Sequence, residues 1–128
     1  MATVHKTQKI QCYYATALRD KPNKVYVRHY IHSRNSGGLW ANIRDLMQKE
    51  KLNNEAVGQE VVVKVTIGYN SKFIENWEKI IVVDKNGNTY KLKEKPDEFE
   101  YNKSDIKFNA YLFREEHDYE EDIYDEGI

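Results

Sequence analysis

The four histidines and the single cysteine are the residues that would carry metal binding or nucleophilic catalysis. They are His5, Cys12, His29, His32 and His117. His29 and His32 fall in one predicted strand, and their odd separation directs the two side chains to opposite faces of that strand. They are therefore a poor chelating pair, and the sequence offers no second cysteine for a zinc site. We expect no metal site in this protein.

Cys12 and the Gly37-Gly38 pair are the remaining candidates for catalytic chemistry. A cysteine nucleophile needs an activating base and a lowered pKa, and no pattern in the sequence links a base to Cys12. Cys12 falls on the inner face of a predicted strand, which favours a small buried hydrophobic residue. Gly37-Gly38 lacks the lysine and the helix of a phosphate-binding loop. We therefore predict that the protein is not an enzyme, with no catalytic residue and no cofactor.

The C-terminal tail, residues 115–128, is strongly acidic. It holds eight carboxylates and no lysine or arginine, so its charge is −8 against +7 for residues 1–114. A run of like charges repels itself and often stays extended, which would make the tail a solvated end that adds solubility. The alternative is a strap that docks on a basic surface of its own or a neighbouring molecule. Three residues that interleave with the acids would anchor that strap: Tyr119, Ile123 and Tyr124.

A second candidate interface lies in the predicted strand 24–33, where Tyr26, Arg28 and Tyr30 share one face. Barrels that bind single-stranded nucleic acid use such aromatic and basic side chains to stack bases and neutralise phosphates. The same tyrosines also suit a protein contact. The acidic tail argues against nucleic-acid binding, because its carboxylates would compete with phosphate for the basic body.

Alternation with a period of two dominates the chain and predicts strands. The predicted strands are residues 8–16, 24–33, 39–44, 60–69, 79–84, 89–94 and 105–113. Asn86-Gly87 is typical of a tight hairpin turn between two of them. Such a set predicts a mainly β protein with an antiparallel sheet curled into a small barrel or sandwich. We expect one barrel domain over residues 1–114, followed by the acidic tail 115–128.

Two apolar positions are predicted to lie inside this barrel. Trp40 stands between Gly37-Gly38 and a polar loop, so tertiary burial is the expected reason for its presence, and we predict that it anchors the core. In the last strand, alternation predicts that Leu112 faces inward together with three other residues. These are Ile106, Phe108 and Ala110. The residues around Trp77 read as a loop.

Residues 46–60 are the least strand-like part of the sequence. Leu46 to Lys51 are good helix formers, but the run is short and Asn53-Asn54 interrupts it. We predict one or two helical turns inside a long loop. Loops of this length in compact domains are usually functional or disordered.

Size and composition limit the classes that remain. A chain of 128 residues with 40% hydrophobic and 32% charged residues fits one soluble domain and excludes a disordered chain. No apolar run approaches the roughly 20 residues that cross a bilayer, and no signal peptide is visible, so no membrane contact is expected. One cysteine excludes an internal disulfide and favours a reducing, cytoplasmic origin.

Several short motifs follow one another between residues 39 and 113. They are Leu39-Trp40-Ala41-Asn42-Ile43, Val63-Lys64-Val65-Thr66-Ile67-Gly68-Tyr69, Lys79-Ile80-Ile81-Val82-Val83-Asp84, and Asn86-Gly87 with Thr89-Tyr90-Lys91-Leu92. Together they resemble the small head–tail joining proteins of long-tailed bacteriophages, also called head-closure or stopper proteins. Leu92 stands where that family has isoleucine. The first 38 residues fit loosely, and the acidic tail lies outside the pattern.

The resemblance implies a structural virion protein that is assembled in the bacterial host cytoplasm. Copies would form a homo-oligomeric ring at the head–tail connector, below the portal and adaptor proteins. That ring closes the DNA-filled capsid and docks the tail through the tail terminator protein.

By the same resemblance, residues 46–60 would project into the channel. Leu46, Met47 and Leu52 would pack against their copies, while Lys49 and Lys51 would face the packaged DNA. An ordinary surface loop is the alternative for this segment. The alternative function for the whole chain is a small OB-like barrel that binds single-stranded nucleic acid as a free monomer.

Overall fold

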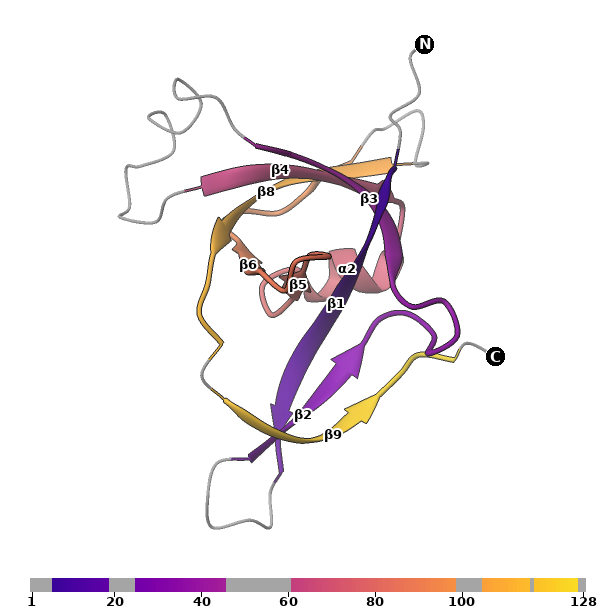
Figure 1. The fold of residues 1–128 in the computed structure, drawn as a ribbon, viewed down its shortest axis with the longest axis vertical. Helices are drawn as coiled ribbons and strands as arrows, with labels where there is room; N and C mark the ends of the chain where they lie inside the picture. Colours follow the sequence, from indigo (N-terminus) through magenta and orange to yellow (C-terminus); the bar gives the residue numbers. More distant parts are fainter. Residues whose placement is uncertain (1–5, 19–24, 46–60, 99–104, 116, 127–128) are drawn as a thin grey trace.

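The computed structural model describes residues 6–18, 25–45, 61–98, 105–115 and 117–126. Strands dominate this part of the chain, together with one short helix (Figure 1). The strands are β1 (Gln8–Ala17), β2 (Val25–Tyr30), β3 (Leu39–Asp45), β4 (Val61–Gly68), β5 (Ile81–Val83), β6 (Thr89–Leu92), β7 (Asp97–Glu98), β8 (Asp105–Leu112) and β9 (Asp118–Ile123); the helix is α2 (Ser71–Asn76).

Six of these strands close a barrel. The antiparallel pairings run in the order β3, β4, β8, β6, β5 and β1, and β1 pairs in turn with β3. Each strand of the barrel thus has a neighbour on both sides, which removes the exposed edges that promote aggregation. The predicted mainly β fold, a small antiparallel barrel, is confirmed.

The core of the barrel follows from the alternation that the sequence shows. Val65 on β4 pairs with Phe108 on β8, and Ile67 pairs with Ile106, all with their side chains inside. The residues between them, such as Lys64 and Lys107, face outward because successive side chains of a strand point to opposite faces. The barrel therefore has an apolar interior and a polar outer wall.

Helix α2 lies where the sequence predicted a loop. Asn70 caps it, since its side-chain oxygen accepts a hydrogen bond of 3.0 Å from the backbone N–H of Phe73. Phe73 is fully buried, and its ring lies 4.8 Å from that of Phe108. Trp77 follows the helix and packs, partly buried, against the same core.

Two predicted core residues are exposed. Trp40 is 56% exposed, because Ala41 is the residue of β3 that turns inward at this point. Its ring instead lies on the outer wall, 5.2 Å from Lys9 Nζ on the neighbouring strand β1. Leu112 is 58% exposed, since it is the last residue of β8 and lies beyond the enclosed interior. The predicted core positions Ile106, Phe108 and Ala110 are buried.

The segment before β3 is an ordered turn. Ser36 Oγ donates a hydrogen bond of 2.8 Å to the carbonyl oxygen of Ser33, and the backbone N–H of Gly37 donates to that of Arg34. Gly38 adopts a φ of 134°, and a Cβ at this position would collide with the carbonyl oxygen of Ile10. Glycine at residue 38 thus lets β3 approach β1 closely and close the barrel.

Residues 46–60, including the predicted channel residues Leu46, Met47, Lys49, Lys51 and Leu52, lie outside the described residues. In the part of the chain that the structure describes, no helix is long and apolar enough to span a membrane.

Candidate functional site

The acidic tail docks on its own molecule. Its strand β9 pairs in parallel with β2, from Val25 opposite Asp118 to His29 opposite Ile123, with an irregularity after Tyr26. Figure 1 shows β9 running beside β2 on the side of the molecule away from β3, β4 and β8. The sequence left open a solvated end and a strap on this or a neighbouring molecule. For residues 118–123 the structure shows a strap on the molecule's own barrel, and the interpretation as an undocked, solvated end is wrong.

Aromatic rings join the tail to the barrel wall. Tyr119 packs edge-on against Tyr13 of β1 at 5.7 Å, and Tyr124 stacks on Tyr30 of β2 at 4.6 Å with the rings almost parallel. Tyr13 and Tyr30 pack together with Ile81 in a cluster that is separate from the barrel core. Because the neighbouring Cys12 faces the core, Tyr13 lies on the outside of the barrel. The tail therefore covers an apolar patch on the outer wall, and we call this contact the tail seam.

Arg28 is held within the tail seam. Its guanidinium carbon lies 4.0 Å from the ring centre of Tyr119 and 5.3 Å from that of Tyr13. A guanidinium nitrogen also lies 3.5 Å from a carboxylate oxygen of Asp122. Cation–π contact and the ion pair both place the charge of Arg28 against the molecule's own tail.

The tail seam also occupies the other residues of the predicted base-stacking face. Tyr30 is buried, and Tyr26 lies half-buried with its ring 4.1 Å from that of His117. Tyr26, Arg28 and Tyr30 do share one face of β2, as predicted, but segment 117–124 covers that face. Of the two uses left open for this face, base stacking and a protein contact, the structure shows a contact with the molecule's own tail.

Glu115 fixes the start of the tail. Its carboxylate accepts hydrogen bonds from Tyr119 Oη at 2.7 Å, from Tyr13 Oη at 3.3 Å and from the backbone N–H of His117 at 2.8 Å. Burial alone would raise the pKa of the Glu115 carboxyl, but the hydrogen bonds from Tyr119 and His117 outweigh it, so the pKa lies below its ordinary value. Burial raises the pKa of the Tyr119 hydroxyl, and its hydrogen bond to Glu115 raises it further.

The far end of the tail is fixed by polar contacts. The backbone N–H of Asp125 donates to the carbonyl oxygen of His32 at 3.0 Å, and its carboxylate forms an ion pair with Lys72 of α2. Glu126 accepts a hydrogen bond of 3.3 Å from the backbone N–H of Arg34. An open hollow of about 400 Å³ lies between this end of the tail, β1, β2 and α2. Of the three predicted anchors, Tyr119 and Tyr124 contact the barrel, whereas Ile123 is 43% exposed.

Four carboxylates of β9 remain on the molecular surface. They belong to Asp118, Glu120, Glu121 and Asp122. Within the described residues β9 pairs only with β2, so it forms an edge of the sheet. Charged side chains on an edge strand hinder unspecific pairing with other strands. The tail thus presents an acidic edge to solvent.

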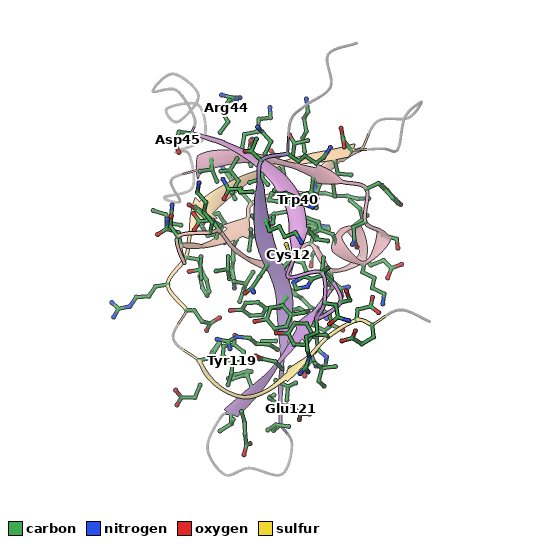
Figure 2. The ribbon with its side chains drawn as sticks, turned by 45° about the vertical axis from the view of Figure 1, so that its right-hand side comes forward. Cys12, Trp40, Arg44, Asp45, Tyr119 and Glu121 are labelled. Atoms are coloured by element: carbon green, nitrogen blue, oxygen red, sulfur yellow. The ribbon has the colours of Figure 1, made fainter. Side chains whose placement is uncertain are left out.

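A basic surface lies on the opposite side of the barrel, over β3, β4 and β8. Arg44 pairs in register with Lys64, and Thr66 pairs with Lys107, so their side chains share the outer wall. They border a hollow of about 180 Å³, which we call the basic hollow. Among the described residues, those that line it are Asn42, Arg44, Lys64, Thr66 and Lys107. Figure 2 shows Arg44 at one end of the molecule and Glu121 at the opposite end.

The basic hollow was not predicted from the sequence. Each of the three cations occupies the outward position of its own strand, and that signal was present in the alternation. Their meeting depends on β4 lying between β3 and β8, which are far apart in the sequence. Local patterns do not specify that order.

The residues that could carry metal binding or nucleophilic catalysis lie in structural contacts. Cys12 is fully buried, as predicted, and burial raises the pKa of its thiol, which disfavours the nucleophilic thiolate. His29 stacks on Tyr14, whereas His32 lies against Tyr30 and Tyr124, so the two histidines do not converge. Among the described residues, no group of three or more histidine, cysteine or acidic side chains could hold a metal ion.

No protein-family model matches the chain, and no curated protein matches it.

Proposed function

We propose that this protein is a structural subunit of the head–tail connector of a tailed bacteriophage. Copies of the chain form a ring that closes the DNA-filled capsid and docks the tail. The observation that carries this proposal is the position of the segments that resemble head–tail joining proteins. They lie in β3, β4, β5 and β6, which belong to the closed barrel, and the resemblance ends with β8 of the same barrel. The resemblance thus covers five of the six strands of the barrel; the sixth strand, β1, lies in the first 38 residues, which fit the family loosely.

The surface of the barrel supports assembly into a ring. A ring of identical subunits needs a heterologous contact, in which one surface of each subunit meets a different surface of the next. This molecule has an acidic edge at β9 and a basic hollow over β3, β4 and β8, on opposite sides. A pair of unlike surfaces favours head-to-tail association over a closed two-fold dimer.

The proposed partners follow from the place of the ring. Portal and adaptor proteins lie on its head side and the tail terminator protein on its tail side, while packaged DNA passes through its channel. Contact between residues 46–60 and that DNA stays a prediction from the sequence. The proposed site of action is the virion, after assembly in the bacterial host cytoplasm.

The proposal is tested by adding the purified protein to a lysate from cells infected with a phage mutant that lacks it. Its DNA-filled heads should lose their DNA, measured as nuclease sensitivity, and should not join to tails. Purified protein added before the heads open should protect the DNA and yield infectious particles, with buffer alone and intact phage as controls. Heads that keep their DNA and accept tails without the protein would contradict the proposal.

A nucleic-acid-binding barrel is the second candidate, and one observation favours it. Exposed Trp40, with Lys9 against its ring, lies on the same strand as Asn42 and Arg44 of the basic hollow. An aromatic ring beside cations is the combination that stacks bases and neutralises phosphates. Fluorescence anisotropy with a labelled single-stranded oligonucleotide distinguishes the two functions. Tight binding by the free monomer, lost in Trp40→Ala, would favour the nucleic-acid function.

A further inference from the structure

We propose that the wall beneath the docked tail is a binding surface for single-stranded nucleic acid, and that the tail is a built-in competitor for it. This wall consists of Tyr13 on β1 and of Tyr26, Arg28 and Tyr30 on β2, and we call it the covered face. The inference does not depend on the proposed ring. It also concerns a different surface from the one around the exposed Trp40.

The covered face combines aromatic rings with a cation. Tyr26 and Tyr30 lie four residues apart on one strand, about 13 Å, with Arg28 between them on the same side. Tyr13 adds a third ring, whose centre lies 5.4 Å from that of Tyr30. Stacking of bases on aromatic rings and neutralisation of phosphates by cations are the contacts that hold single strands without reading their sequence. The covered face therefore has the composition of a single-strand binding surface.

The docked tail makes the contacts that such a strand would make. The ring of Tyr124 stacks on Tyr30 with an angle of 8° between the two planes, as a base would. The carboxylate of Asp122 pairs with Arg28, as a phosphate would. Rings and carboxylates follow one another along the tail, as bases and phosphates do along a nucleic acid. The tail and a single strand would thus compete for the same side chains.

Two further cations hold the end of the tail, beyond the covered face. Lys72 of α2 forms an ion pair with Asp125. The guanidinium carbon of Arg34 lies 4.8 Å from the ring centre of Tyr124. A single strand that followed the path of the tail would meet these cations after Arg28, and its phosphates could replace the carboxylates there.

The tail satisfies Arg28 incompletely. Its ion pair with Asp122 is long, at 3.5 Å, and Arg28 Nε is buried without a hydrogen-bond partner among the described residues. A guanidinium binds a phosphate through two parallel hydrogen bonds. A nucleic acid that displaced the tail would therefore supply a contact that the tail lacks.

Competition by the tail has a measurable size. The apparent affinity for a ligand falls in proportion to the fraction of molecules whose site is open. A change that weakens the tail and leaves the covered face intact should therefore strengthen binding. One base stacked on an aromatic ring changes an affinity by about 5-fold to 140-fold, so the site is strong enough to detect once it is open.

A full-length variant with a weakened tail tests the competition. Tyr119→Ala with Tyr124→Ala removes the two rings that hold the tail on the barrel and leaves the net charge unchanged. It should bind a labelled single-stranded oligonucleotide about tenfold more tightly than the wild type, measured by fluorescence anisotropy. Ile123→Ala is the matched control, since Ile123 is an exposed residue of the same strand, and it should bind as the wild type does. Equal affinities of all three proteins would overturn the inference.

A further substitution locates the bound strand. Arg28→Gln, added to the weakened-tail variant, should remove the gain in affinity. Lys85→Gln, added to the same variant, neutralises an exposed cation of the turn between β5 and β6 and should leave the gain in place. Equal losses in the two proteins would mean unspecific attraction of the oligonucleotide by positive charge, and the inference would be wrong.

A second pair of variants covers the case in which the loss of both rings unfolds the protein, which circular dichroism would show. Asp122→Asn with Asp125→Asn removes the two carboxylates that form ion pairs with Arg28 and Lys72. Asp118→Asn with Glu121→Gln removes the same charge and leaves both ion pairs in place. Only the first of these proteins should gain affinity beyond the effect of charge; equal gains would contradict the inference.

An extended protein segment is the competing occupant of the covered face. A labelled peptide with the sequence of residues 115–126 is measured on the same variants. If the weakened-tail variant bound this peptide and no oligonucleotide, the covered face would be a protein-docking site and the inference would be wrong. Retention of DNA by phage heads tests the proposed function separately, so either proposal can fail alone.

Discussion

Phe73 and Trp40 show how differently two large aromatic residues contribute to this barrel. Phe73 is fully buried against Phe108, whereas Trp40 lies on the outer wall beside Lys9. Phe73→Ala should therefore lower the free energy of unfolding by about 3–5 kcal/mol, as large aromatic truncations in cores do. Trp40→Ala should change it by less than about 1 kcal/mol. Urea unfolding of both variants, followed by circular dichroism, measures the difference.

A larger loss of stability in Trp40→Ala than in Phe73→Ala would contradict this prediction. Trp40 would then be buried, and the register of β3 against β1 would be wrong. The sequence did contain the signal for its exposure. Leu39, Ala41 and Ile43 share one face of the strand, and Trp40 is the apolar residue on the other face.

Glu115 gives the tail a dependence on pH. Its pKa in the folded protein lies below the ordinary value of 4.5, so its ionised form stabilises the docked tail. That contribution is present above about pH 4.5 and is lost as the pH falls through the lower, folded pKa. Glu115→Gln should unfold more easily than the wild type at pH 7, and the difference should shrink below pH 4.5. Urea unfolding between pH 3 and pH 7 measures it; a difference that is independent of pH would contradict the assignment.

At the scale of elements, Gly38 is the residue that lets β3 meet β1. A Cβ at this position would collide with the backbone of Ile10, whereas a Cβ at Gly37 would meet no atom within 4 Å. Both glycines have positive φ, so alanine costs backbone strain at either position. Gly38→Ala should therefore lower the melting temperature clearly more than Gly37→Ala. Equal effects would mean that β3 can shift away from β1 without loss.

The tail is a structural element as well as a charged one. Deleting residues 115–128 removes the rings that cover Tyr13, Tyr30 and Ile81 on the outer wall. The barrel core does not include the tail, so the truncated protein should keep its β-type circular dichroism spectrum. It should bind more of a dye specific for apolar surface than the full chain does. Unchanged dye binding would show that other residues cover the patch.

The elements that the sequence predicted correctly are those with a strong local pattern. Strand β4 alternates from Val63 onward, Asn86-Gly87 specifies the turn between β5 and β6, and β8 repeats the alternation. Helix α2 was missed because six mostly polar residues carry no periodicity. Strand β9 was missed because its carboxylates disfavour a strand locally, and pairing with β2 together with Tyr119 and Tyr124 overrides that preference.

At the scale of the whole molecule, a net charge of −1 conceals two opposed surfaces. The sequence predicted the acidic tail and its aromatic anchors, because both lie in one continuous segment. It did not predict where the positive charge gathers, since Arg44, Lys64 and Lys107 come from three strands. The relation between the two surfaces depends on the order of strands in the barrel.

Electron cryomicroscopy of the connector, assembled from the portal, the adaptor and this protein, tests the central claim most directly. The account predicts a ring of β-barrels below the adaptor. A connector without a layer formed by this protein would contradict it.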